Sequence, residues 1–363
     1  MRAQAGISTV RSPASGVAFV TIVVIAGACA SQRRPVTTPG IAHPDHALAI
    51  ERGRNIVRPL VRRGSGVAVA VGVDGQLVWS EGFGRTARAG GEPVRPDSPF
   101  RVYSLMKQVT AVLALQSAGR GEVGMRDPVR HVLPALPEHY RQVTLLQLLT
   151  HTAGVRHYRD PSEATLTTRC ASAGEALPLF IADPLVGVPA GEESYSTWGF
   201  VLASAVLEAA AGMPFDSLLA IRILQPAGMT STHLDGTADP ASRPTYYDVA
   251  ADGAVSVSAS VDNSCKMGGG GFVASAEDIV RFHNAVLDGS LVPLVAVRQM
   301  LAGRTTLEAG GSGTGGEALS YVDIDSRISV VVLSNTGGLE QRIALERARE
   351  LLADVFTPAS VAH

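Results

Sequence analysis

The order of the apolar segments along this chain constrains its fold more than any other feature of the sequence. A helical pattern over residues 44–62 precedes two strand-like runs, 66–73 and 76–81, and the Asp74-Gly75 pair between them is typical of a tight hairpin turn. Two further strand-like runs and a long amphipathic helical pattern end the chain, at 321–324, 327–334 and 339–356. The two ends of the chain can therefore share one antiparallel sheet.

The stretch between these ends is mostly helical in pattern. Its apolar segments are bounded by glycine and proline signals and cover residues 105–118, 145–149, 198–211, 215–224 and 276–287. This order predicts an α+β fold, in which an antiparallel sheet is flanked by helices and stands beside an inserted helical region. We expect one domain over residues 45–357, with the active site in the cleft between the sheet and the helical region.

The first thirty residues resemble an export signal. Arg2 and Arg11 supply positive charge, and the apolar run over residues 16–28 is too short for a comfortable membrane span. We therefore predict a signal peptide over residues 1–30. The Pro- and Thr-rich segment over residues 31–44 is predicted to be a tether.

The end of this signal leaves two interpretations open. Ala26-Gly27-Ala28-Cys29 resembles a bacterial lipobox, in which Cys29 would be lipidated and become the mature N-terminus. The alternative is ordinary cleavage after Ala28 or Ala30. In either case we expect an exported protein of the bacterial cell envelope, either periplasmic or anchored to the membrane through a lipid at Cys29.

Lysine is rare enough in this chain to be informative. Lys and Arg together number 31, but only Lys107 and Lys266 are lysines. A lysine amine can lose its proton, which an arginine cannot. Lys107 follows Ser104 by three residues, so on a helix both side chains share one face, where the amine can serve as base for the hydroxyl. Alone this pair is a weak signal, and the alternative is a Ser N-cap followed by a surface Lys.

The surroundings of this pair resemble the penicillin-binding-protein/β-lactamase family. Residues 100–103 and the apolar helix after Lys107 look like the S-x-x-K region of class C β-lactamases, D-alanyl-D-alanine carboxypeptidases and related esterases. The resemblance implies that Ser104 is the nucleophile and Lys107 its base. It also implies an acyl-serine enzyme that needs no metal or other cofactor.

The family's second motif matches Tyr195-Ser196-Thr197. The class C group carries Tyr-x-Asn here, so Thr197 is a departure, although the mitochondrial serine β-lactamase-like group shares Tyr-Ser-Thr. The resemblance implies that Tyr195 passes protons beside the lysine and that Thr197 orients substrate. The alternative is a buried structural tyrosine.

The third motif is the least complete. The best match to Lys-Thr-Gly or His-Thr-Gly is Gly313-Thr314-Gly315-Gly316, which lacks the cation. By correspondence, Thr314 would contact substrate, and the N–H of Gly316 would join that of Ser104 in holding an oxyanion. The alternative is a flexible glycine loop.

Other patterns narrow the expected function. Asn263, in Val-Asp-Asn, comes too late in the chain for the family's Ser-Asp-Asn motif, and His151 is interpreted as structural because no Gly-x-Ser-x-Gly elbow accompanies it. No zinc-binding spacing is present, and a net charge of −2 argues against nucleic acid as partner. Lys266 is a candidate replacement for the cation missing at Gly313.

The resemblance to the mitochondrial serine β-lactamase-like group extends over residues 45–356 and implies peptide or ester substrates. Two rivals stay open: an esterase or weak β-lactamase on the same scaffold, and a non-catalytic binding protein. The sequence leaves the oligomeric state open. It also leaves open whether Cys170 and Cys265 form a disulfide in an oxidising compartment.

Overall fold

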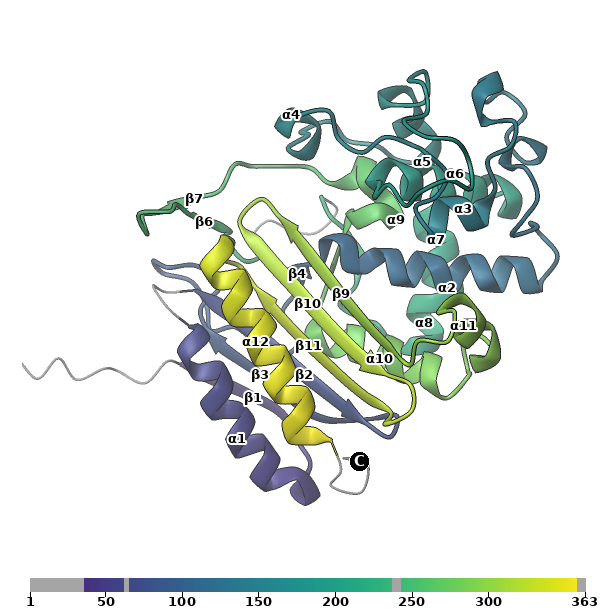
Figure 1. Ribbon diagram of the computed structural model, residues 1–363. Helices are drawn as coiled ribbons and strands as arrows, with labels where there is room; N and C mark the ends of the chain where they lie inside the picture. The colour runs from purple at the N-terminus through teal and green to yellow at the C-terminus, as the bar shows by residue number, and fades with distance from the viewer. Residues whose placement is uncertain (1–35, 62–64, 237–242, 358–363) are drawn as a thin grey trace, which may run out of the picture. The chain divides into compact units, whose positions relative to one another are not determined.

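A six-stranded sheet joins the two ends of the chain. The computed structural model describes residues 36–61, 65–236 and 243–357. The strands of this sheet are Thr37–Ala42 (β1), Gly66–Val73 (β2), Gln76–Gly84 (β3), Thr306–Gly313 (β9), Gly316–Asp323 (β10) and Ile328–Ser334 (β11). They lie in the order β1-β3-β2-β11-β10-β9, and every neighbouring pair is antiparallel (Figure 1). The predicted α+β class with an antiparallel sheet is therefore confirmed.

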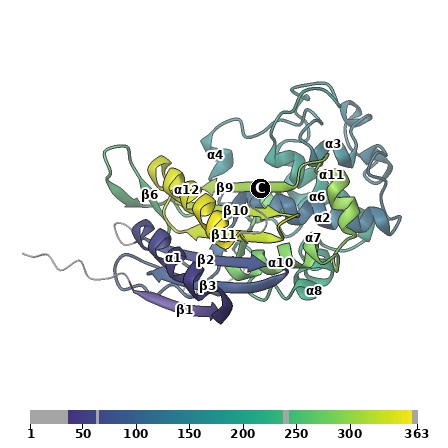
Figure 2. The same ribbon diagram turned by 60° about the horizontal axis from the view of Figure 1, so that its bottom comes forward.

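Helices cover both faces of this sheet. The helices α1 (Ala47–Val57) and α12 (Leu339–Phe356) pack on one face, and α10 (Ala276–Leu287) packs on the other (Figure 1, Figure 2). Strand β2 shows how the alternating side chains divide between the two layers. Val67 and Val69 belong to the core under α1 and α12, whereas Ala68 and Ala70 belong to the core on the α10 side.

The inserted region between β3 and β9 is mostly helical, as predicted. Besides α10, its helices are α2 (Met106–Gly119), α3 (Leu145–Leu149), α4 (Pro161–Ala164), α5 (Ala173–Ala176), α6 (Thr197–Ala211), α7 (Phe215–Leu219), α8 (Gln225–Ala227), α9 (Met267–Gly270) and α11 (Leu294–Met300). Its short strands are β4 (Phe100–Arg101), β5 (His233–Leu234), β6 (Tyr247–Val249), β7 (Val255–Val257) and β8 (Phe272–Ala274). The long buried helices α2 and α6 form its centre.

Three sequence assignments need correction or fall outside this description. The predicted tether over residues 31–44 is wrong for residues 37–42, because β1 pairs there with β3. Strand β9 was not predicted, because its glycines are poor strand formers. The predicted signal peptide and Cys29 lie outside the described residues.

Candidate active site

Ser104 lies in a tight 3-10 turn, Tyr103–Leu105, directly before α2. The backbone of Tyr103 has a φ of 46°, in the left-handed region that aromatic residues seldom adopt. The Tyr103 ring packs so closely on Gly313 that a Cβ there would come within 2.4 Å of it. Tyr103 Oη also donates to the carbonyl of Thr314 at 3.1 Å. This strained turn therefore fixes Ser104 against the β9–β10 hairpin.

Ser104, Lys107 and Tyr195 meet at hydrogen-bond distance. Lys107 Nζ lies 2.9 Å from Ser104 Oγ, and Tyr195 Oη lies 2.6 Å from the same oxygen. The amine also lies 4.8 Å from the centre of the Tyr195 ring. A serine hydroxyl in contact with two proton-transfer groups has the geometry of an activated nucleophile. The structure thus brings together the three residues assigned to catalysis from the sequence.

The surroundings of Lys107 favour its neutral form. Its side chain is buried, with the residue 7% exposed, and no described carboxylate forms an ion pair with it. Burial, together with the positive charge of Lys266, lowers the pKa of Lys107 to about 7. Nζ lies 2.6 Å from the Gly269 carbonyl and 3.3 Å from Thr197 Oγ1. A neutral amine can donate to both of these oxygens and keep its lone pair for the proton of Ser104.

Two histidines hold the segment that carries Tyr195. His151 Nδ1 accepts from the N–H of Ser196 at 3.0 Å, and His157 Nδ1 accepts from the N–H of Thr197 at 3.2 Å. Their rings lie 4.6 Å and 5.3 Å from the Tyr195 ring. Burial lowers the pKa of both histidines, that of His151 to about 4, so both are neutral and able to accept.

This location refines the interpretation of His151. From the sequence, His151 is interpreted as a structural residue. In the structure it follows α3 but is neutral, and it accepts from the N–H of Ser196, next to Tyr195. Nothing near His157 in the sequence indicates its matching role, because the pairing of the two rings depends on the tertiary fold.

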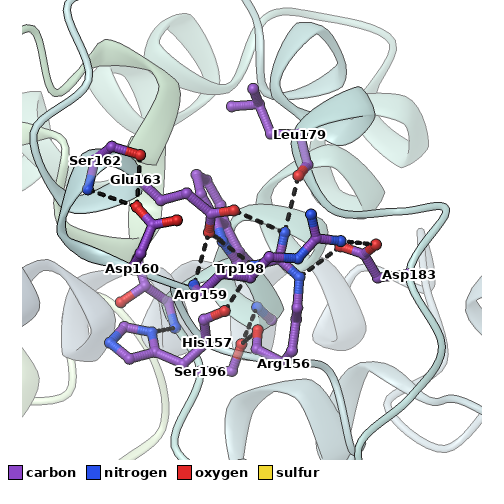
Figure 3. Close-up of polar contacts among 12 residues, drawn as sticks. Arg156, His157, Arg159, Asp160, Ser162, Glu163, Leu179, Asp183, Ser196 and Trp198 are labelled. Atoms are coloured by element: carbon purple, nitrogen blue, oxygen red, sulfur yellow. Dashed lines mark hydrogen bonds and ion pairs between the residues drawn. The ribbon is translucent and has the colours of Figure 1, made fainter.

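A partly buried ion cluster supports the same segment (Figure 3). Arg156 donates to Glu163 at 2.7 Å and to Asp183 at 2.5 Å, and Trp198 Nε1 donates to Glu163 at 3.1 Å. Ser196 Oγ donates to the carbonyl of Arg156 at 2.6 Å. Charged hydrogen bonds are stronger than neutral ones, and they are screened less where the groups are partly buried. The cluster therefore anchors the loop before α4 to the first turn of α6.

The glycine-rich third motif forms the hairpin between β9 and β10. Gly313 and Thr314 line the cavity in front of Ser104, but Gly316 is buried in β10 and does not line it. The assignment of the Gly316 N–H to the oxyanion site therefore needs correction. Because Gly313 pairs with Gly316 across the two-residue turn, the outward N–H groups of the edge strand belong to Ser312 and Gly310, which both line the cavity.

Lys266 lies in the same cavity, together with a residue that the sequence analysis set aside. Lys266 Nζ donates to Asn263 Oδ1 at 2.7 Å and to the carbonyl of Ala164. Dismissing Asn263 was wrong in one respect, because it lines the cavity and fixes this lysine. The neighbouring Cys265 forms a disulfide with Cys170, which settles the question that the sequence left open.

Two cavities meet at Ser104 and Tyr195, and their linings differ. The first, of about 260 Å³, has both polar and apolar lining, and we call it the polar cavity because Lys266, Asn263 and Arg342 line it. The second, of about 530 Å³, runs beside α2 and is mostly apolar. A substrate with its carbonyl at Ser104 can therefore place one end in each cavity.

Two further properties concern the described residues. In residues 36–61, 65–236 and 243–357, no group of three or more His, Cys, Asp or Glu side chains is arranged to hold a metal ion. Within the same ranges no single helix has the length and apolar character to cross a membrane, although the bent pair Thr197–Ala211 and Phe215–Ala227 meets these criteria jointly.

Comparison with protein families places this geometry in a known group. The family model described as Beta-lactamase matches residues 54–354. The chain belongs to this β-lactamase family. The match covers the helical region, all strands of the six-stranded sheet except β1, and all three residues at the centre of the site.

Relatives within this family match most of this chain at low identity. Serine beta-lactamase-like protein LACTB, mitochondrial, is 26% identical from Mus musculus and 25% identical from Homo sapiens, over 78% and 68% of this chain. The chain spans 65% and 58% of the length of these curated relatives. A D-amino acid amidase from Ochrobactrum anthropi SV3 has a similar fold, with a TM-score of 0.72 and 22% identity over 84% of this chain and 99% of the amidase.

Proposed function

We propose that this chain is an exported serine hydrolase that forms an acyl-serine intermediate on peptide or ester substrates. The observation that carries this proposal is the contact of Ser104 Oγ with both Lys107 Nζ and Tyr195 Oη, where the pKa of the lysine is about 7. Two relatives support the substrate class. A D-aminopeptidase from Cereibacter sphaeroides is 27% identical over 79% of this chain and 60% of its own length, and Esterase EstB from Burkholderia gladioli is 30% identical over 46% of each chain.

In the first step, Ser104 Oγ attacks the substrate carbonyl carbon while its proton passes to neutral Lys107. The carbonyl oxygen becomes an oxyanion, which the N–H of Ser104 can hold together with an outward N–H of the edge strand, at Gly310 or Ser312. The C–N or C–O bond then breaks, and the leaving group takes the proton from Lys107 through Tyr195. In the second step, water attacks the acyl-serine, its proton passes to Lys107, and Ser104 regains its own proton as the acid departs.

A covalent probe tests this proposal without knowledge of the natural substrate. Wild-type protein should be labelled by a fluorophosphonate or a fluorescent β-lactam, and Ser104→Ala should lose the label. Ser162→Ala is a matched control, because Ser162 is an exposed serine in α4. A folded wild-type protein that reacts with neither probe would favour the rival of a non-catalytic binding protein.

A panel of peptides, p-nitrophenyl esters and cephalosporins separates the enzymatic rivals. A neutral third motif suits esters, which have no carboxylate to pair, so an esterase is the second candidate, and turnover of cephalosporins would indicate a weak β-lactamase.

The cation missing at Gly313 has two candidate replacements in the polar cavity, Lys266 and Arg342. We propose Lys266, because its direct partners are a carbonyl and an amide oxygen and not a carboxylate, whereas Arg342 pairs with Glu346 at 2.9 Å. Lys266→Ala should lower the ratio of kcat/KM for a carboxylate-bearing substrate to that for its neutral ester. Equal losses on both substrates would contradict this role, and a larger change in Arg342→Gln would assign it to the arginine.

The predicted route to the cell envelope is a separate proposal. We propose that residues 1–30 direct export and that Cys29 is lipidated, because small residues precede this cysteine after a short apolar run. Radiolabelled palmitate should enter the wild-type protein in a bacterial host but not Cys29→Ala. Cleavage after Ala28 or Ala30 without label in the wild type would support a soluble exported form.

A further inference from the structure

The apolar cavity beside Ser104 runs along one face of α2. Ser104 lines it from the turn directly before α2, and Lys107, Ala111 and Leu115 follow on successive turns of the helix. At 1.5 Å per residue, this face extends roughly 16 Å from the nucleophile. The cavity is therefore a channel that begins at the reacting atom and ends far from it.

The lining of this channel includes apolar side chains that are only partly buried. Helix α11 contributes Val297 and Met300, yet no residue of α11 is buried. Leu307, on β9, and Leu115, on α2, are likewise only partly buried. Apolar groups that face an open channel gain stability when an apolar ligand excludes water from them.

The polar cavity sets the direction of the substrate. A leaving group must accept a proton and depart before water attacks, and a cavity lined by Lys266, Asn263 and Arg342 suits a polar amine or alcohol. The acyl group remains bonded to Ser104 through both steps. Apolar contacts with the acyl group are therefore kept through both steps, whereas contacts with the leaving group are lost after the first.

We propose that the channel along α2 binds the apolar acyl chain of the substrate, so that the enzyme prefers esters or amides of medium-length fatty or arylalkyl acids. This inference rests on the proposed function. It assigns the channel to the acyl side of the scissile bond and the polar cavity to the leaving group.

A series of p-nitrophenyl esters from acetyl to dodecanoyl tests the proposal. In the wild type, kcat/KM should rise by about 3- to 4-fold for each added methylene until the channel is full. Ala111→Phe narrows the channel two turns from Ser104, so the decanoyl-to-acetyl ratio of kcat/KM should fall at least tenfold. Ala118→Phe is the matched control, because Ala118 lies two turns further along the same face and does not line the channel.

A second variant tests the proposal even if Ala111→Phe fails to fold. Met300→Ala widens the channel at its α11 wall and should move the preferred chain length to longer acids. Ser104-dependent hydrolysis with no dependence on acyl length in the wild type would overturn the proposal. A matched series of acetate esters with alcohols of increasing length is the counter-test. The proposal would also be overturned if Ala111→Phe lost the dependence of kcat/KM on alcohol length and not its dependence on acyl length.

The proposed function fails in a different way. If no ester is hydrolysed and no fluorophosphonate labels Ser104, the chain is not a serine hydrolase and the channel has no acyl group to bind. Hydrolysis without length dependence leaves the proposed function standing and removes only the acyl assignment.

Discussion

The two lysines of this chain are equally buried, each 7% exposed, but they have different partners. Lys107 contacts the hydroxyl of Ser104, and burial with the charge of Lys266 lowers its pKa to about 7. Lys266 is held by Asn263 and by the carbonyl of Ala164. Burial and the charge of Arg101 lower its pKa to about 8, while Asp235 opposes this change.

These different surroundings indicate that the two lysines have different roles. An amine that touches a nucleophile and has a pKa near neutrality can exchange protons with it. An amine held by two oxygen acceptors, away from Ser104, serves better as a fixed charge. Lys266 also lowers the pKa of Lys107, so the fixed charge helps to keep the base unprotonated.

The largest expected effect comes from replacing Lys107. Arginine retains the charge but cannot release a proton, so Lys107→Arg should lower kcat/KM by about 10³-fold, as should Lys107→Met. Ester hydrolysis with each variant measures this loss, and thermal unfolding checks that the fold survives. If Lys107→Arg kept more than a tenth of wild-type activity, Lys107 would act only through its positive charge, as proposed for Lys266. The two lysines would then not differ in role.

Removal of the Tyr195 hydroxyl should have an intermediate effect. Tyr195→Phe keeps the ring that packs on His151 but removes the oxygen 2.6 Å from Ser104 Oγ. We expect about a hundredfold lower kcat/KM, with a smaller loss for esters whose leaving groups need no proton. The same loss for p-nitrophenyl and alkyl esters would argue against a role for Tyr195 in protonating the leaving group.

The smallest effect is expected from Lys266→Met on neutral esters. Loss of its charge raises the pKa of Lys107, so the rise of kcat/KM with pH should move to higher pH. At pH 7 the activity should fall by a few fold. Addition of base should restore the activity of Lys266→Met but not that of Lys107→Met. If the dependence of kcat/KM on pH were the same in Lys266→Met and the wild type, the two lysines would not interact.

Acid should act on the site through its histidines as well. The pKa of His151 is lowered from the ordinary value of 6.5 to about 4, so the unfolded state binds more protons between these values. The stability contributed by neutral His151 is therefore lost as the pH falls from about 6.5 towards 4. His151→Gln should flatten this part of the curve of unfolding free energy against pH, and an unchanged slope would contradict the assignment.

The sequence predicted those parts of the fold that depend on local pattern. Strand β2 coincides with an alternation of valines. Helix α3 begins after the Thr144 capping box, and helix α10 begins after the Ser275 N-cap. Strands β1 and β9 were missed because Pro39 and the glycines of residues 310–313 disfavour strands locally. Pairing with β3 and β10 decides their structure, and that pairing is a long-range property.

The candidate site likewise has some residues that local sequence predicts and others that depend on the tertiary fold. Ser104 and Lys107 share one turn of helix, and Tyr195 belongs to a motif, so sequence reasoning could find all three. The roles of His157, Asn263 and Ser312 depend on segments that only the fold brings together. The missing cation at Gly313 drew attention to the hairpin, but only the strand register shows which N–H groups face the cavity.

The pH dependence of fluorophosphonate labelling at Ser104 tests the central claim most directly, because it needs no knowledge of the substrate. The second-order rate constant should rise with pH, with a midpoint near 7 in the wild type and a higher midpoint in Lys266→Met. A rate that stays constant between pH 5 and pH 9, or that falls as the pH rises, would contradict the assignment of Lys107 as the base of this serine.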